Sequence, residues 1–425
     1  MIKEFIKINS LKGKLLLPGD KSISHRAVMF AAMANGKSNI SNCSNSEDVN
    51  STMNCFKQLG AEISFNDKTI EIIGLGFKNL VKSNSNLDAG NSGTTARLIS
   101  GILSAQNFSS NINGDESLSA RPMMRIVKPL QSMGAKIKAS ESGTLPITIN
   151  PSDYLHAIDY EMEISSAQVK SAIILAAIHL SETTSIIERN PTRNHTENML
   201  GVKTEKLLDG KKIFASKENY PNPFEMTIPS DISSASFFIV LTLLSKNSEL
   251  IIQSVSLNET RTGILEILKR MGANIEIDNI ILENGEMRGD IIVKSSKLKN
   301  VDVPSSIIPN IIDEIPILSV AGVFAEGNFR ISKAKELRVK ESDRIKSICN
   351  NFKLAGLNIV EFEDGFEISG IPTNAKVAYE SYGDHRIAMA FAVMAMLSEF
   401  GGSVNQFEAV NVSNPDFLNQ IKAIV

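Results

Sequence analysis

Cationic side chains recur in this sequence beside short clusters of Gly, Ser, Thr, Asn and Asp, a pattern that suits the binding of anions. They are Lys21, Arg26, Arg97, Arg121, Arg125, Lys170, Arg193, Arg338, Lys340, Arg344 and Arg386. Arginine binds carboxylate and phosphate through two parallel N–H donors. Ordinary surface charge explains most of the 44 lysines and arginines, but it does not explain this recurring position. We therefore expect an anion-binding site.

Single motifs in the chain are weak evidence for any particular chemistry. The string GNSGTT at 90–95 resembles a phosphate-binding loop, but no Lys-Ser/Thr follows its second glycine, so it is no Walker A motif. Taken alone, the pair Asp313-Glu314 is more typical of a helix N-cap than of a catalytic acid. Glu341 alone is more typical of a surface ion pair on the helix RVKESDRIKSI. The histidines His25 and His195 are more typical of hydrogen-bonded structural groups than of bases.

Six apolar segments follow the polar clusters, and we expect each to form a buried helix. They are KSISHRAVMFAAMA, SGTTARLISGILSA, SAQVKSAIILAAIH, SSASFFIVLTLL, DEIPILSVAGVFA and DHRIAMAFAVMAML. A helix that is apolar on most faces must be buried, yet its first N–H groups need polar partners. Those N–H groups and the helix dipole favour anions. The pattern predicts two three-fold arrangements whose polar helix starts face a shared cleft.

The glycines of the chain indicate an internal repeat. Four segments, FKQLGAEISF, LQSMGAKIKA, LKRMGANIEI and FKLAGLNIVE, and a weaker copy, MLGVKTEKL, each join the end of an amphipathic helix to an alternating strand. Their central glycines are Gly60, Gly134, Gly201, Gly272 and Gly356. Glycine commonly ends a helix in the left-handed conformation. That preference does not explain why these glycines recur at the same interval along the chain as the polar clusters. Six units of about 70 residues account for nearly the whole chain.

Six units in 425 residues predict two domains of three units each. We expect an N-terminal lobe at 19–226 and a C-terminal lobe made of 1–18 and 227–425. Each unit is expected to be of the βαβαββ type, with two helices and about four short strands, so the fold class is α/β with buried helices and mixed sheets. Two chain crossings between the lobes would form a hinge.

The composition excludes several classes of protein. Hydrophobic residues make up 42% and charged residues 21%, which is typical of a globular protein, and the net charge of −3 indicates no general affinity for nucleic acid or membranes. The N-terminus has no apolar leader segment, and the longest apolar run is too short to span a bilayer. Three cysteines without CxxC spacing favour neither a disulfide framework nor a zinc site, and we expect a cytoplasmic protein.

Read together, the motifs resemble the 5-enolpyruvylshikimate-3-phosphate (EPSP) synthase family. The matching strings are LPGDKSISHRAVMFAAMANG, AGNSGTTARLISG, GDESLSARPMMRI, SSAQVKSAIILAA, PTRNHTENML, IPSDISSASFF, IDEIPILSVAGVFAEG, ELRVKESDRI and YGDHRIAMAFAVMA. They occur in the family's order, cover residues 16 to about 400 and touch all six units. The strings GNSGTT, SAQVKSA and RNHTENML are most similar to the sequences of the family's second class.

The resemblance implies an enolpyruvyl transferase-like fold of two lobes that close on their substrates. It implies transfer of the enolpyruvyl group of phosphoenolpyruvate to the 5-hydroxyl of shikimate 3-phosphate with release of phosphate, on the pathway to chorismate and the aromatic amino acids. It also implies that the enzyme uses no metal or organic cofactor. The expected partners are these two small molecules, without nucleic acid or membrane, and the expected state is a monomer.

The resemblance also implies roles for individual residues. Shikimate 3-phosphate is expected to contact Lys21, Ser22, Arg26, Ser166, Gln168, Asp313 and Lys340. Phosphoenolpyruvate is expected to contact Lys21, Gly93, Arg121, Gln168, Arg344 and Arg386. The expected catalytic residues are Asp313, Glu341 and Lys21.

The chemistry explains these residue types. A ring hydroxyl must attack C2 of phosphoenolpyruvate while C3 takes a proton, which requires a base and an acid. Asp313 suits the first task and Glu341 the second, while arginines and helix N–H groups stabilise the charge of the leaving phosphate. One departure concerns the tail, because some members of the family carry a lysine before a Pro-acidic pair. Here the string VSNPD at 412–416 has no lysine.

Two alternative functions remain at this stage. The enolpyruvyl transferase that acts on UDP-N-acetylglucosamine would share the fold, but that family carries a cysteine where this chain has Glu116, and 114–125 contains no cysteine. A nucleic-acid module with an RNA-cyclase-like fold would need a basic face with exposed aromatic side chains. Aromatic residues make up only 6% of the chain, and there is no Trp. Both alternatives are therefore less favoured.

Overall fold

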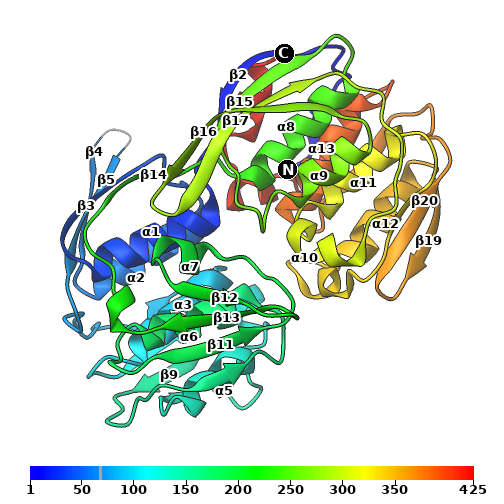
Figure 1. The fold of residues 1–425 in the computed structure, drawn as a ribbon. Helices are drawn as coiled ribbons and strands as arrows, with labels where there is room; N and C mark the ends of the chain where they lie inside the picture. Colours follow the sequence, from blue (N-terminus) through cyan, green and yellow to red (C-terminus); the bar gives the residue numbers. More distant parts are fainter. Residues whose placement is uncertain (67–68) are drawn as a thin grey trace. The chain divides into compact units, whose positions relative to one another are not determined.

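The computed structural model describes residues 1–66 and 69–425 and divides into two compact units (Figure 1). Unit 1 consists of Met1–Pro18, Pro229–Ile281 and Met287–Val425, and unit 2 consists of Gly19–Ile228 and Leu282–Glu286. The sequence led us to expect passages between the units at 18–19 and 226–227. It did not lead us to expect that the short segment Leu282–Glu286 would belong to unit 2.

Unit 2 repeats one sheet topology three times. Its strands are β3 (Asn35–Ser41), β4 (Glu62–Asn66), β5 (Thr69–Leu75), β6 (Leu87–Asp88), β7 (Ser110–Asn113), β8 (Lys136–Lys138), β9 (Ile147–Asn150), β10 (Asp159–Glu161), β11 (Thr184–Glu188), β12 (Lys203–Lys206), β13 (Lys211–Ala215) and β14 (Glu225–Thr227). Over the described residues they form sheets of order β14-β3-β5-β4, β6-β7-β9-β8 and β10-β11-β13-β12. In each sheet the first two strands pair parallel and the others antiparallel.

Unit 1 contains one four-stranded sheet and two three-stranded sheets within the part of the chain that the structure describes. Its strands are β1 (Lys3–Phe5), β2 (Lys12–Leu16), β15 (Glu249–Ser256), β16 (Asn274–Glu283), β17 (Glu286–Lys294), β18 (Phe329–Ile331), β19 (Asn358–Phe362), β20 (Gly365–Ser369), β21 (Val377–Glu380) and β22 (Gly402–Asn405). The orders are β16-β17-β15-β2, β18-β20-β19 and β1-β22-β21. The expectation of about four strands per repeat is therefore too high for two of the repeats. The N-terminal strands β1 and β2 complete sheets of unit 1.

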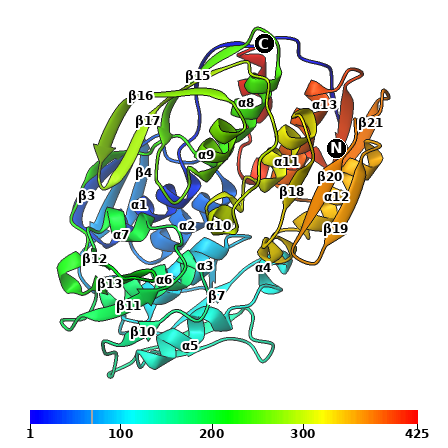
Figure 2. The same cartoon turned by 45° about the vertical axis from the view of Figure 1, so that its right-hand side comes forward.

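Each sheet is accompanied by two helices, of which the first is buried. The pairs are α1 (Lys21–Met33) with α2 (Glu47–Gln58), α3 (Gly93–Leu103) with α5 (Met124–Ser132), α6 (Ala167–Ala177) with α7 (His195–Met199), α8 (Ile232–Leu244) with α9 (Gly263–Arg270), α11 (Ile315–Phe324) with α12 (Arg344–Leu354), and α13 (His385–Leu397) with α14 (Phe417–Lys422). Short helices α4 (Glu116–Ser119) and α10 (Ile308–Ile311) lie between them. Within each unit the buried helices lie inside and the sheets outside (Figures 1 and 2).

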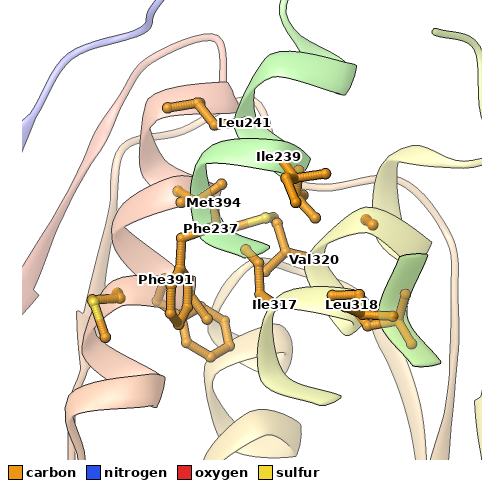
Figure 3. Packing of buried hydrophobic residues seen from close by; sticks show 14 of the residues in the cluster. Phe237, Ile239, Leu241, Ile317, Leu318, Val320, Phe391 and Met394 are labelled. Carbon is orange, nitrogen blue, oxygen red and sulfur yellow. The ribbon is translucent and has the colours of Figure 1, made fainter. Parts of the chain in front are cut away.

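Apolar side chains from three helices fill the centre of each unit. Figure 3 shows Phe237, Ile239 and Leu241 of α8 meeting side chains of α11 and α13, and these residues are nearly inaccessible to solvent. In unit 2 the corresponding core is built on α1, α3 and α6. The prediction of six buried helices in two sets of three is confirmed, because these are the six apolar segments that follow polar clusters in the sequence.

The five phased glycines all have positive φ, as expected for helix-closing residues. The φ angles are +99° at Gly60, +88° at Gly134, +59° at Gly201, +96° at Gly272 and +78° at Gly356. Each glycine follows the second helix of its repeat and precedes a strand. The left-handed conformation is readily available to glycine. The regular spacing of these glycines in the sequence therefore marks a helix-ending turn that occurs once in each of five repeats.

No single helix among the described residues is long and apolar enough to cross a membrane. One bent pair, Ser305–Ile311 with Ile315–Phe324, meets the criteria of length and composition only when both segments are taken together, with an angle of 115° between them.

Candidate functional site

Arg26 joins three helices of unit 2 close to their N-terminal ends. Its Nη1 donates to the carbonyl of Ser22 on α1 at 2.8 Å, its Nη2 to Oγ of Ser171 on α6 at 3.0 Å, and its Nε to Oγ1 of Thr196 on α7 at 2.7 Å. Burial lowers the pKa of Arg26 to about 10, although nearby carboxylates oppose the shift. The guanidinium therefore stays charged at neutral pH, and these three hydrogen-bond acceptors are neutral.

Lys21 is the first residue of α1, and Asp20 sets its position. The Asp20 side chain caps the helix by accepting from the backbone N–H of Ile23 at 2.9 Å. The Lys21 ammonium lies 2.7 Å from Oδ2 of Asp48, and both side chains keep some exposure, 23% and 12%. An ion pair that water reaches contributes little to stability. An anionic ligand can therefore compete with Asp48 for the ammonium of Lys21. Ser22, which follows Lys21, is half-buried.

His25 is a buried structural group. Its Nδ1 lies 2.7 Å from Oγ1 of Thr52, which in turn lies 2.7 Å from Oγ1 of Thr95. Burial lowers the pKa of His25 to about 3, with Asp48 opposing the shift and Lys21 adding to it. This neutral imidazole supports the packing of α1 against α2 and α3.

Gln168 connects the beginning of α6 to the beginning of α3. Its Oε1 accepts from Nη1 of Arg97 at 2.5 Å, and its Nε2 donates to Oγ1 of Thr94 at 3.1 Å. Gly93 is the first residue of α3, and a Cβ at this position would lie 2.9 Å from Nη1 of Arg97. A larger residue would therefore displace the Arg97 side chain, so glycine preserves the contact with Gln168.

Arg121 and Ser166 also lie close to helix starts in unit 2. Nη2 of Arg121 donates to Oδ1 of Asn91 at 2.7 Å and to Oγ of Ser117 at 3.3 Å, so both partners are neutral. Ser166 is the N-cap of α6, and its Oγ accepts from the backbone N–H of Val169. Both Arg121 and Ser166 are half-buried, so a ligand can reach them.

Lys170 does not fit the anion-binding role that its position in the sequence suggested. Its ammonium is fully buried and lies 2.8 Å from a carboxylate oxygen of both Glu188 and Glu197. Lys211 approaches the same two carboxylates at 3.2 Å. Burial alone would raise the pKa of Glu197, but Lys170 and Lys211 together lower it. The four residues form a charge-balanced structural cluster.

Arg344 is the centre of the corresponding network in unit 1. Its Nε lies 2.7 Å from Oδ2 of Asp384, its Nη1 3.2 Å from Oδ1 of Asp313, and its Nη2 2.6 Å from Oε2 of Glu341. Burial alone would lower the pKa of Arg344, but these carboxylates raise it well above its ordinary value. Burial alone would raise the pKa of Asp384, but Arg344 lowers it. Arg344 therefore holds a permanent charge that the protein's own carboxylates surround.

Asp313 lies between two arginines and caps no helix. Its carbonyl accepts from Nη1 of Arg386 at 3.1 Å, and its Oδ2 lies 3.6 Å from Nη2 of the same arginine. The N-cap of α11 is Glu314, without a side-chain capping bond, and its Oε1 lies 3.7 Å from Nη1 of Arg386. Of the pair Asp313-Glu314, Glu314 is thus the N-cap residue, whereas the carboxylate of Asp313 faces Arg344 and Arg386.

Glu341 lies in a loop and not on a helix, contrary to the sequence prediction. The 3-10 helix Lys335–Val339 ends before it, and α12 begins only after Asp343, which caps that helix. The Glu341 side chain is 28% exposed. Lys340 lies beside it with its Nζ 3.2 Å from Oε1 of Glu336. The loop leaves Glu341 reachable by a ligand while Arg344 orients it.

Arg261 is a member of the unit 1 network that the sequence analysis missed. It is 2% exposed, donates to Oγ of Ser233, and lies 3.7 Å from both Asp231 and Glu314. Glu314 also accepts a hydrogen bond from Ser233. The string Arg261-Thr262-Gly263 shows the same pattern of arginine beside small polar residues as the other sites, so this signal was available.

The C-terminal tail contributes a packed amide pair formed by Asn414 and Gln420. Nδ2 of Asn414 donates to Oε1 of Gln420 at 2.8 Å, and Nε2 of Gln420 donates back to Oδ1 of Asn414 at 3.1 Å. Both side chains are buried. The tail is thus fixed in place by neutral groups, and 412–416 supplies no cation.

The described residues include no group of three or more His, Cys, Asp or Glu side chains that could hold a metal ion. Cys43, Cys55 and Cys349 are free thiols, and burial raises their pKa values to about 11, 12 and 12 respectively. These thiols are therefore weak nucleophiles.

The chain matches a known protein family over nearly its whole length. The family model described as EPSP synthase (3-phosphoshikimate 1-carboxyvinyltransferase) matches residues 6–421. The chain belongs to the EPSP synthase family. The resemblance expected from the motifs is confirmed, and so is the enolpyruvyl transferase-like fold.

Curated relatives carry the activity in their names. A 3-phosphoshikimate 1-carboxyvinyltransferase from Thermodesulfovibrio yellowstonii is 44% identical over 422 residues, which is 98% of each chain. Another with the same name from Thermoanaerobacter sp. (strain X514) is 45% identical over 417 residues, covering 97% of this chain and 98% of the relative.

Solved structures show the same fold over the whole chain. EPSP synthase from Acinetobacter baumannii is 38% identical, with a TM-score of 0.89, and the match covers 99% of this chain and 97% of that one. The enolpyruvyl transferase NikO from Streptomyces tendae is 15% identical with a TM-score of 0.76, and it shares the fold.

Proposed function

We propose that the protein transfers the enolpyruvyl group of phosphoenolpyruvate to the 5-hydroxyl of shikimate 3-phosphate and releases inorganic phosphate. Membership of the EPSP synthase family over nearly the full length supports this reaction. The observation that carries the proposal is the grouping of Arg26, Gln168 and Arg97 at the starts of the buried helices of unit 2. Donors held on helix starts are suited to a doubly anionic substrate.

Shikimate 3-phosphate is assigned to Lys21, Ser22, Arg26, Ser166 and Gln168 in unit 2. Arg26 supports this role because its direct partners are hydroxyls and a carbonyl, which leave its charge available. Lys21 supports it because an anion can displace the partly exposed Asp48. The assignment of Lys340 is weaker, because its ammonium pairs with Glu336.

Phosphoenolpyruvate is assigned contacts from both units. Gly93, Arg121, Gln168 and Lys21 are the proposed contacts from unit 2, and Arg344 and Arg386 those from unit 1. Arg121 is hydrogen-bonded to neutral groups, whereas Arg344 is bonded to carboxylates. Under this proposal, turnover requires residues of both units.

The proposed chemistry uses Asp313 as base and Glu341 as acid. Asp313 accepts the proton of the 5-hydroxyl as its oxygen bonds to C2 of phosphoenolpyruvate, while Glu341 gives a proton to C3. A proton then leaves the methyl carbon, the C–O bond to phosphate breaks, and the double bond returns. Arg344 supports both roles, because it touches both carboxylates.

We further infer that the protein acts in the cytoplasm as a monomer on these two small molecules, without a nucleic-acid or membrane partner. The net charge of −3 and the low aromatic content support the absence of a nucleic-acid role. The elution volume of the purified protein, read with light scattering, tests the monomer directly, and a mass of twice the chain would reject it.

An acceptor-exchange assay tests the proposed function. Phosphate release from phosphoenolpyruvate is measured with shikimate 3-phosphate, with unphosphorylated shikimate, and with UDP-N-acetylglucosamine. We expect release with the first acceptor and almost none with the other two. The preference for shikimate 3-phosphate over UDP-N-acetylglucosamine is supported by Glu116 at the start of α4. The family that acts on UDP-N-acetylglucosamine is expected to have a cysteine at this position. Release driven by UDP-N-acetylglucosamine, or by no acceptor, would reject the proposal.

A further inference from the structure

The turn between β16 and β17 is a two-residue hairpin loop that belongs to unit 2. Its central residues are Asn284 and Gly285, with φ angles of +47° and +76°. Positive φ at both positions is the requirement of the tight turn that matches the twist of paired strands, and Asn-Gly is its preferred sequence. Such a turn fixes the register of the hairpin, and a slip of one residue would turn each side chain to the opposite face.

The turn is held in unit 2 by hydrogen bonds of the two residues that precede Gly285. Oε1 of Glu283 accepts from the backbone N–H of Thr227 at 3.2 Å, and Nδ2 of Asn284 donates to the carbonyl of Glu225 at 2.7 Å. A Cβ on Gly285 would lie 2.2 Å from the carbonyl oxygen of Asn198, so only glycine fits there. The turn therefore lies directly against α7.

The fixed register directs Glu286 into the interior of unit 2. Its Oε1 lies 2.9 Å from Nδ1 of His195, and the two side chains are 1% and 0% exposed. Strand β16 is mostly exposed between Asp278 and Leu282, just before the turn. The burial of a carboxylate directly after an exposed strand is unusual, because a buried charge is costly unless it is paired and hydrogen-bonded.

The partner of Glu286 begins the helix that orients Arg26. His195 is the first residue of α7, and the next residue, Thr196, accepts from Nε of Arg26 at 2.7 Å and lies 2.7 Å from Oγ of Ser171. The Glu286 carboxylate also acts on Arg26 through space, because its charge favours the protonated guanidinium. One carboxylate thus acts on Arg26 both through His195 and electrostatically.

We propose that Glu286, which the β16–β17 hairpin places against His195, is a positioning residue that sets Arg26 for binding shikimate 3-phosphate. This inference rests on the proposed function, and it adds a residue from outside the helix starts. The ring of His195 fixes the first turn of α7, and α7 presents Thr196 to Arg26. Loss of the Glu286 charge weakens the contact that fixes the ring of His195, so that α7 is held less firmly.

The test compares two charge-removing variants of the same turn. Glu286→Gln removes the carboxylate that faces His195, and Glu283→Gln removes the neighbouring carboxylate but keeps an oxygen that accepts from Thr227. Binding of shikimate 3-phosphate to the full-length protein is measured by calorimetry without phosphoenolpyruvate. We expect Glu286→Gln to raise Kd roughly 5-fold to 10-fold, because the neutral amide can still accept from His195 but makes a weaker hydrogen bond than a carboxylate and no longer supplies the charge that acts on Arg26. We expect Glu283→Gln to stay within about twofold.

Kinetics separate positioning from a purely structural role. For Glu286→Gln we expect a higher KM for shikimate 3-phosphate, with kcat at saturation and the KM of phosphoenolpyruvate within about twofold of the unaltered protein. A lower melting temperature with a Kd equal to that of Glu283→Gln would show that the contact only stabilises the fold, and the inference would be wrong.

A second pair of variants covers the case in which Glu286→Gln does not fold. His195→Asn keeps an N–H donor near the place of Nδ1, and His195→Ala removes it. We expect the Asn variant to bind shikimate 3-phosphate within about threefold of the unaltered protein and the Ala variant about tenfold or more weakly. Equal Kd values for the two variants would overturn the inference. Absence of turnover in the unaltered protein would reject the proposed function, and absence of shikimate 3-phosphate binding there would reject both.

Discussion

The two units differ in what the arginines at their helix starts contact. In unit 2, Arg26 and Arg121 donate to hydroxyl, amide and carbonyl oxygens. In unit 1, Arg344 is bonded to three carboxylates and Arg386 lies close to two. The sequence motifs look alike in both units, since each places arginine beside small polar residues. Most of the partners come from other segments of the chain, which the local motif does not determine.

The difference indicates how each unit treats an anion. A guanidinium with neutral partners keeps its attraction for phosphate or carboxylate, and an anion adds to its hydrogen bonds. A guanidinium with carboxylate partners must exchange one of them for the ligand, which cancels most of the gain. Unit 2 is therefore organised for binding before the ligand arrives. In unit 1 the same contacts orient Asp313 and Glu341, which suits a catalytic role.

The largest effect is expected at Asp313. Asp313→Asn keeps a side chain of the same shape near Arg344 and Arg386 but removes the base, so kcat should fall about 100-fold or more. The Kd of shikimate 3-phosphate, measured by calorimetry, should change far less, because unit 2 carries most of that binding. A variant with nearly normal kcat would remove Asp313 from the mechanism.

Glu341 should separate turnover from affinity. Glu341→Gln should lower kcat about 100-fold or more because the proton for C3 is lost. The KM of phosphoenolpyruvate should stay level or fall, because one competitor for Arg344 loses its charge. The matched control is Glu336→Gln, which removes an exposed carboxylate that contacts Lys340. A parallel rise of KM in the Glu341 variant would contradict the idea that unit 1 carboxylates compete with the substrate.

Arg121 should show the opposite pattern from Glu341. Arg121→Ala removes a guanidinium whose partners, Asn91 and Ser117, are neutral, so no carboxylate is left without its cation. We expect weaker phosphoenolpyruvate binding by about 1.5–3 kcal/mol, seen as a higher KM, with a smaller change in kcat. An unchanged KM would refute the assignment of Arg121.

The smallest expected effect concerns acid stability and involves unit 2. Burial lowers the pKa of His25 to about 3 and that of His179 to about 4. Each folded-state pKa lies below the unfolded value, so the unfolded chain binds more protons between the two values and stability falls as pH drops below about 6.5. At pH 5 each histidine lowers the free energy of unfolding by about 2 kcal/mol.

Urea unfolding at pH 7 and pH 5 measures this loss. His179→Gln should reduce the difference between the two pH values by up to about 2 kcal/mol. His156, which is exposed, provides the control variant His156→Gln, for which the difference should stay as in the unaltered protein. An equal pH dependence in all three proteins would show that burial of His179 does not determine acid stability.

The fold followed from the sequence where the signal was local. A polar cluster before an apolar segment predicted each of the six buried helices, and the phase of five glycines predicted the turns that close the second helices. Both patterns reflect demands within one helix, namely partners for its first N–H groups and a left-handed residue at its end. The strand number was less accurate, because two sheets of unit 1 have three strands.

The site followed only in part, because side-chain partners come from distant segments. The sequence identified Arg344 and Asp313 but not that they touch, and it placed Glu341 on a helix that in fact begins after Asp343. It listed Lys170 among anion-binding residues, although two carboxylates from other elements neutralise it. Local spacing reveals residue types and element ends, whereas pairing depends on how the elements pack.

The most direct test of the account uses phosphoenolpyruvate labelled with heavy oxygen in the bridge between C2 and phosphorus. Both products of the reaction with shikimate 3-phosphate are weighed by mass spectrometry. The account predicts that all of the label leaves with the phosphate, because the hydroxyl of shikimate 3-phosphate attacks C2 and the C–O bond breaks. Label retained in the carbon product would mean that the P–O bond breaks, which would contradict enolpyruvyl transfer by this site.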